Sequence, residues 1–143
     1  MRILIVEDDI TSRILMKRYL AAFGICDVAT DGLEALESFH RAHGEAAPYG
    51  LICLDIMMPK LDGIATLRAV RDYERCRGLD EGGRVKVIMT TALNDDMTIR
   101  ESFEAGCEAY VWKPIDVNRF TEVLKELGMI PERQHHSEAG SGA

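Results

Sequence analysis

The chain has 143 residues, enough for one domain with a sizeable core, and 47% of them are hydrophobic, which excludes an intrinsically disordered protein. The formal net charge of −7 argues against non-specific binding to nucleic acid or to an anionic membrane surface. The first apolar run, residues 3–6, is too short for a signal peptide or a membrane span, so we expect a cytoplasmic protein with no membrane or nucleic-acid partner.

Short apolar runs alternate with segments of helical periodicity from the first residue onward. The runs typical of buried strands are residues 2–6, 25–29, 50–54, 85–90 and 108–112. Helices are expected at residues 10–23, after Asp31, after Asp62, from Asn94 or Asp95 to 105, and at 116–127. Aspartates suited to N-caps precede these helices, and glycines suited to helix ends follow three of them, at Gly24, Gly106 and Gly128.

Five strands alternating with five helices predict an α/β fold: a doubly wound (βα)5 arrangement with a five-stranded parallel sheet. The flavodoxin-like strand order 2-1-3-4-5 suits this count. We expect residues 1–130 to form the domain and 131–143, which are small and polar, a disordered tail without a further domain. The connection at 74–84 is longer than the others, and we interpret it as a solvated loop, with a longer third helix or a partner contact as alternatives.

Charged and polar side chains stand at the ends of four predicted strands. Glu7 and Asp8 follow the first, Asp55 the third, Thr91 the fourth and Lys113 the fifth. Ligands of open parallel sheets bind at the carboxyl ends of the strands, next to the switch in strand order. That switch lies between the first and third strands, so the three carboxylates are expected side by side.

Such a set can hold a divalent cation and a phosphoryl group. Crowded carboxylates repel one another, and Mg²⁺, which prefers oxygen ligands, removes the conflict. Asp55, at the end of the central strand, is the expected nucleophile for an aspartyl-phosphate, and Lys113 and Thr91 would stabilise the phosphoryl oxygens. Taken singly, each of these residues also has an ordinary interpretation as a turn or helix cap; their complementary types at four strand ends favour the site.

At these residues the chain resembles the response regulator receiver family. The matching elements are Val6-Glu7-Asp8, Asp55 with Met58-Pro59 and Asp62-Gly63, Thr91-Ala92, Tyr110, and Lys113-Pro114. The resemblance covers about residues 1–128.

The resemblance implies a role for each matching residue. Asp55 would accept the phosphoryl group, and Mg²⁺ would be held by Glu7, Asp8, Asp55 and the Met57 backbone carbonyl. Lys113 would contact the phosphoryl group.

The resemblance also implies a switch. Thr91 would turn toward the phosphoryl group, Tyr110 would follow by changing rotamer, and the Lys113–Pro114 peptide bond would be cis. Apolar Met57 and Leu93 occupy positions that in the family flank the entry of attacking water, so we expect slow self-dephosphorylation.

The function implied is that of a single-domain response regulator in a two-component phosphorelay. The phosphodonor would be a sensor histidine kinase or a histidine phosphotransfer protein. The output would be a population shift of the surface formed by 95–105, 108–112 and 116–127, read by an unknown protein target. We expect a monomer or a weak phosphorylation-dependent dimer that is not an enzyme and catalyses only its own phosphorylation and dephosphorylation.

Other functions remain open at this stage. A Mg²⁺-dependent aspartyl-phosphate phosphatase of the haloacid dehalogenase type would show D-x-D-x-T at the nucleophile, but Met57 stands where its second acid is required. A phosphate sink would take up and lose phosphate without changing any partner's affinity. A structural adaptor would bind its partner without needing Asp55.

Overall fold

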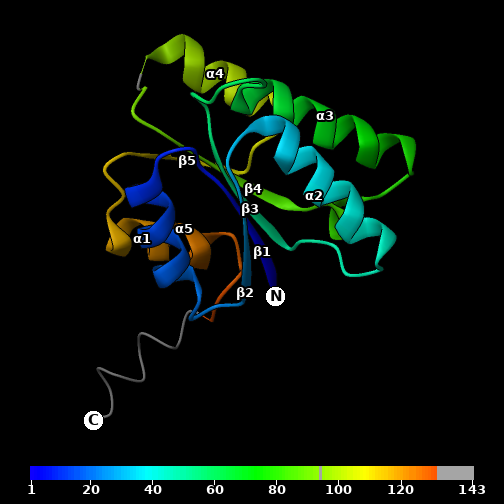
Figure 1. Cartoon of the computed structure of the whole chain (residues 1–143), viewed down its shortest axis with the longest axis horizontal. Coiled ribbons are helices and arrows are strands. Elements are labelled where there is room, and N and C mark those ends of the chain that lie inside the picture. Colours follow the sequence, from blue (N-terminus) through cyan, green and yellow to red (C-terminus); the bar gives the residue numbers. More distant parts are fainter. Residues whose placement is uncertain (94, 132–143) are drawn as a thin grey trace.

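Five parallel strands form one sheet, in the order β2-β1-β3-β4-β5 (Figure 1). The predicted doubly wound fold with its flavodoxin-like strand order is therefore confirmed. The computed structural model describes residues 1–93 and 95–131. The strands are β1 (Arg2–Val6), β2 (Ile25–Ala29), β3 (Leu51–Asp55), β4 (Lys86–Thr91) and β5 (Ala109–Trp112).

Each α-helix begins after an aspartate whose carboxylate accepts a backbone N–H of the first turn. Such a cap satisfies a donor that the helix itself leaves unpaired. The capping residues are Asp9, Asp31, Asp62, Asp95 and Asp116. The helices are α1 (Ile10–Leu20), α2 (Gly32–Gly44), α3 (Gly63–Cys76), α4 (Asp96–Ala105) and α5 (Val117–Glu126), with a 3₁₀ turn η1 (Glu81–Gly83).

The helices cover both faces of the sheet (Figure 1). α1 and α5 pack on one face, around Ile5, Leu20 and Phe120, while α2, α3 and α4 pack on the other, around Leu4 and Leu67. Successive strand residues point to opposite faces. The central strands β1 and β3 are therefore apolar over most of their length, which is why they could be found as uninterrupted runs, whereas the edge strand β2 is largely exposed.

The first helix is shorter than predicted. It ends at Leu20 rather than at residue 23, because the next residues form a tight turn in which Phe23 N–H donates to the Leu20 carbonyl at 2.9 Å. Phe23 still packs against the core from this turn. Its place in the apolar pattern therefore reflects burial rather than a further helical turn.

The connection at 74–84 is not simply a solvated loop. Helix α3 continues through Glu74 to Cys76, and the Glu74 side chain is fully buried. Its carboxylate accepts the Val85 N–H at 2.8 Å and fixes the start of β4. Residues 78–84 then form an exposed turn that includes η1.

Two further findings bear on the sequence predictions. Within residues 1–93 and 95–131, no helix is both long and apolar enough to cross a membrane. The tail predicted for residues 131–143 lies, beyond Pro131, outside the described residues.

Candidate functional site

Three carboxylates meet where β1 and β3 end. Val6 pairs with Leu54 across these adjacent strands, so Glu7, Asp8 and Asp55 leave the sheet side by side. One oxygen from each lies within 4.8 Å of the others. Glu7 and Asp55 are buried, whereas Asp8 is exposed. The structure therefore brings together the predicted acidic residues and leaves one of them open to solvent.

Lys113 reaches this cluster from the end of β5, across the intervening strand β4. Its Nζ lies 2.6 Å from Glu7 Oε1 and 3.4 Å from Asp55 Oδ2. Its backbone N–H donates to the Thr91 carbonyl at 2.8 Å, and the Lys113–Pro114 peptide bond is cis. The ammonium thus stands against the carboxylate proposed as nucleophile.

The electrostatics of the cluster are those of a crowded acidic pocket. Burial, together with the neighbouring charge of Glu7, raises the pKa of Asp55 to about 7, although Lys113 opposes the shift. Burial alone would lower the pKa of Lys113, but its hydrogen bond to Glu7 and the charge of Asp55 raise it. A hard divalent cation would relieve the repulsion among the carboxylates, so the donor set fits Mg²⁺.

The two residues of the Glu7-Asp8 pair have different surroundings. Besides Lys113 at Oε1, Glu7 accepts the Asp9 N–H at Oε2, at 3.1 Å, so both of its oxygens already have protein partners. Asp8 is exposed and better placed for direct coordination. Arg13, which the sequence analysis missed, donates to the Glu7 carbonyl at 3.0 Å from α1. The i, i+6 spacing of Arg13 and Glu7 carries no recognisable pattern.

Asp55 is followed by a loop that turns sharply into α3. Gly63 N–H donates to the Ile56 carbonyl at 2.9 Å, and this bond draws the helix start against the strand end. The Met57 side chain is exposed, while Met58 packs against the core. The assignment of the Met57 carbonyl as a metal ligand stays a prediction.

Thr91 and Tyr110, the two expected switch residues, are joined through Leu93. The buried Thr91 Oγ1 accepts the Leu93 N–H at 3.1 Å. The Tyr110 hydroxyl donates to the Leu93 carbonyl, and burial of the phenol, reinforced by the nearby charge of Asp95, raises the pKa of Tyr110 to about 12. Sequence analysis considered Leu93 only for water access and missed this bridge.

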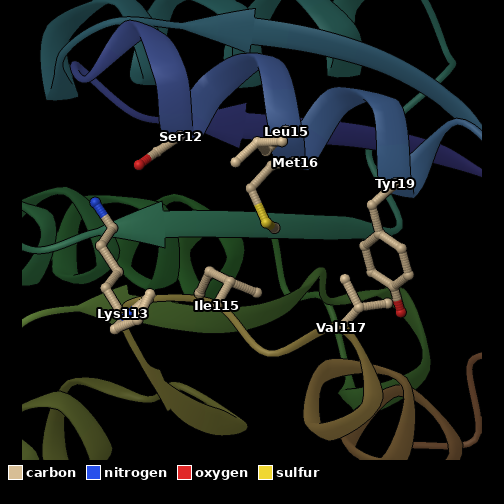
Figure 2. Close-up of a pocket in the computed structure, with 8 residues that line it drawn as sticks. Ser12, Leu15, Met16, Tyr19, Lys113, Ile115 and Val117 are labelled. Carbon is tan, nitrogen blue, oxygen red and sulfur yellow. The ribbon is translucent and has the colours of Figure 1, made fainter.

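A cavity of about 220 Å³ opens beside Lys113, between α1 and the start of α5. Figure 2 shows Met16 and Ile115 facing each other across it, with Lys113 and Ser12 at one end. Next to it, α1 exposes a group of large apolar side chains: Ile10, Ile14 and Leu15. This apolar surface was not predicted, because its residues read as part of an ordinary amphipathic helix.

Comparison with known proteins agrees with the fold. Residues 3–125 match the response regulator receiver domain family. The chain belongs to this family, whose members are receiver domains of two-component signalling.

Three relatives illustrate the range of the family. The polar-differentiation response regulator DivK of Brucella ovis is 34% identical over 127 residues, covering 86% of this chain and 92% of DivK. The osmosensing histidine protein kinase SLN1 of Saccharomyces cerevisiae is 30% identical over 128 residues, 88% of this chain but 10% of the kinase. The receiver domain of sensor histidine kinase PA1611 from Pseudomonas aeruginosa, solved with a magnesium ion in its active-site cleft, has a TM-score of 0.69 and 26% identity, covering 87% of this chain and 94% of that one. The chain spans 7 to 12% of the length of SLN1 and of two other histidine kinases that it matches.

Proposed function

We propose that this chain is a response regulator receiver that accepts a phosphoryl group on Asp55 from a sensor histidine kinase or a histidine phosphotransfer protein. The observation that carries the proposal is the position of Asp55, buried beside Glu7 and Asp8 and 3.4 Å from the Lys113 ammonium. The only chemistry proposed is the gain and loss of the phosphoryl group on this one aspartate.

Mg²⁺ is the proposed cofactor, and the magnesium ion in the related PA1611 receiver supports it. Asp8, Asp55 and the Met57 carbonyl would hold it, with Glu7 beside them, and bound Mg²⁺ would neutralise charge on the phosphoryl oxygens.

The protein's own groups would then do the following. The Asp55 carboxylate attacks phosphorus, its new O–P bond forming as the donor's P–N bond breaks. The Lys113 ammonium stabilises the charge on the phosphoryl oxygens. Thr91 exchanges its bond with Leu93 for one with the phosphoryl group.

The donor protein would approach over α1. The apolar residues Ile10, Ile14 and Leu15 and the cavity of Figure 2 form a surface that continues to Lys113, at the rim of the acidic site. A partner that buried this apolar surface would be positioned to present its phosphohistidine to Asp55.

The proposed output surface lies on the other side of Lys113, on α4, β5 and α5. Phe103 and Trp112 are exposed there, and a cavity of about 330 Å³ lies between them and α5. Tyr110 lines the same cavity, so a change in its rotamer would alter a surface that a target protein could read. The downstream target stays unnamed.

The experiment that tests the proposal is intact-mass measurement after incubation with Mg²⁺ and acetyl phosphate. The expected result is a mass increase of one phosphoryl group that disappears when Mg²⁺ is chelated. It should also be absent in Asp55→Asn, while Asp72→Asn, an exposed aspartate on α3, serves as the matched control. A folded protein that forms no adduct, either with acetyl phosphate or with phosphorylated histidine phosphotransfer proteins, would overturn the proposal.

Two measurements separate the alternatives. Turnover of a small phosphoester in excess over protein would indicate a phosphatase instead. A phosphate sink would form the adduct, yet no protein would bind the phosphorylated and unphosphorylated forms with different affinity.

A further inference from the structure

The C-terminal end of α4 is fixed by a side chain from the neighbouring helix α3. Arg71 is buried, and its Nε and Nη2 donate to the Gly106 carbonyl, directly after α4, at 3.1 and 2.9 Å. Its Nη2 also donates to Glu108 Oε1 at 2.9 Å. The other guanidinium nitrogen, Nη1, donates to Glu74 Oε1 at 2.7 Å and to the Val85 carbonyl at 2.8 Å.

The two glutamates extend these bonds into the sheet. Glu74 accepts the Val85 N–H at 2.8 Å, and Glu108 accepts the Val87 N–H at 2.7 Å. The network of Arg71, Glu74 and Glu108 therefore ties α3, the start of β4 and the turn after α4 together. A buried guanidinium with all of these partners resists displacement, because moving it would leave charged groups unpaired in the interior.

The two ends of α4 differ in how deeply their side chains are buried. The buried residues of the helix, Ser102 and Ala105, lie in its C-terminal half. Asp96 and Met97 at its start are exposed, Met97 by 68%. Gly106 has φ +109°, and a Cβ there would meet the Arg71 side chain at 3.2 Å, so the turn is shaped to the guanidinium.

On the N-terminal side of α4, Leu93 is bound to Thr91 and Tyr110, which are the residues expected to switch. We propose that the Arg71 network is a fixed pivot for α4, so that rearrangement at Thr91 and Tyr110 swings the N-terminal half of the helix while its C-terminal end stays in place. The swing rests on the proposed function; the anchoring by Arg71 does not. Within α4, the proposal limits the phosphorylation-dependent change to the N-terminal half of the helix.

The anchor is tested by amide hydrogen exchange in Arg71→Lys without any phosphodonor. Lysine keeps the charge, but it cannot reach all of the carbonyl and carboxylate partners at once. Exchange of the amides at 102–108 should accelerate by at least about tenfold, with little change at 95–99. Arg75→Lys is the matched control, since Arg75 lies one turn further along α3 and pairs with Asp72 on the surface.

Equal exchange at 102–108 in Arg71→Lys and Arg75→Lys would overturn the anchor, as would acceleration spread evenly over α4. If Arg71→Lys does not fold, Glu108→Gln replaces it. This variant keeps one oxygen that can accept the Val87 N–H, but it removes the charge and replaces the second oxygen, which accepts from Arg71 at 3.2 Å, with an NH2 donor. Its control is Glu104→Gln, an exposed glutamate of α4.

The swing is tested in the wild-type protein, once intact mass confirms the phosphoryl adduct. Exchange should change at 91–99 and stay unchanged at 102–108, and equal changes at both ends would overturn the pivot. Failure to form an adduct would count against the proposed function and against the swing. The comparison of the unphosphorylated variants would still decide the anchor.

Discussion

Thr91 and Tyr110 are coupled through the two backbone groups of a single residue. The Thr91 hydroxyl accepts the N–H of Leu93, and the Tyr110 hydroxyl donates to its carbonyl. Movement of Thr91 toward Asp55 would free the Leu93 N–H, and the loop would then be held less firmly at the point where Tyr110 binds it. The two switch residues are thus both bound to Leu93, and either of them can break its bond to that residue.

The first prediction concerns Tyr110→Phe. Loss of the hydroxyl removes the bond to the Leu93 carbonyl, so phosphorylation should still occur, but its effect on β5 should be smaller. Trp112 reports this effect, because it is the only tryptophan and its ring centroid lies 6.0 Å from that of Tyr110. Phosphorylation should change Trp112 fluorescence in the wild type, and substantially less in Tyr110→Phe.

Tyr73→Phe on α3 is the control, and its fluorescence change should match that of the wild type. A full wild-type response in Tyr110→Phe would show that the hydroxyl plays no part in coupling.

The second prediction concerns Lys113→Met. The ammonium that faces Glu7 and Asp55 is lost, so adduct formation with acetyl phosphate should slow by at least about tenfold. Mg²⁺ affinity, measured by calorimetry, should hold or rise, because the carboxylates lose a competing cation. Lys17→Met on the exposed surface of α1 should alter neither quantity. Equal loss of Mg²⁺ binding and phosphorylation would instead indicate a collapsed site.

The third prediction is a pH dependence that arises from Asp55. The pKa of Asp55 is raised from 3.8 to about 7 in the folded protein, so the folded state holds this proton more tightly than the unfolded chain does. Its contribution to stability is fully present below pH 3.8 and is lost as the pH rises through about 7. At about 1.4 kcal/mol per pKa unit, the upper bound of the loss is about 4 kcal/mol.

Urea unfolding of the metal-free protein at about pH 5 and about pH 8 measures this loss. Asp55→Asn should lack it and should be the more stable protein at the higher pH. Mg²⁺ should then stabilise the wild type more than Asp55→Asn. A stability difference between the two proteins that does not vary with pH would contradict the raised pKa.

The fourth prediction addresses the lifetime of the phosphoryl group. Met57 is 59% exposed, two residues after Asp55, and cannot hydrogen-bond a water there as an amide can. Met57→Asn should shorten the half-life of the phosphoryl adduct several-fold. Intact-mass measurement after removal of the phosphodonor gives this half-life. Met97→Asn, the same change at an exposed position of α4, should leave the half-life unchanged. Equal half-lives in all three proteins would reject slow dephosphorylation as a property of Met57.

Much of this fold is readable from sequence because its three inner strands, β1, β3 and β4, are buried on both faces. Uninterrupted apolar runs such as residues 51–54 mark strands, and the aspartate caps mark helix starts. The flavodoxin-like strand order then predicts that Asp55 lies beside Glu7. Helix ends were less certain, since Phe23 is apolar and buried but belongs to a turn.

The contacts that individual side chains make within the site could not be predicted in this way, because they depend on the three-dimensional positions of the side chains. Nothing in the spacing indicates that Lys113 lies nearer to Glu7 than to Asp55. The bonds to Leu93 involve backbone groups, which carry no residue signature. The role of Arg71 is also hidden in the sequence. A charged residue on an amphipathic helix is expected to be solvated, and only the structure shows Glu74 and Glu108 around it.

The last prediction concerns Gly63, the first residue of α3. A Cβ there would lie 2.2 Å from the Asp55 carbonyl oxygen and 2.8 Å from Ile56 Cα, both rigid backbone atoms. Gly63→Ala must therefore push the helix away from the strand that carries the phosphoacceptor, at a cost of about 2 kcal/mol or more in the free energy of unfolding. Phosphorylation should slow as well, because the Asp55 carboxylate is displaced from Lys113.

Gly44→Ala, at the end of α2 with no atom within 4 Å of the added Cβ, should be neutral or slightly stabilising. Urea unfolding measures the change in stability, and the time course of adduct formation measures the change in phosphorylation rate. A Gly63→Ala protein with wild-type stability and wild-type phosphorylation would show that this close contact does not position Asp55.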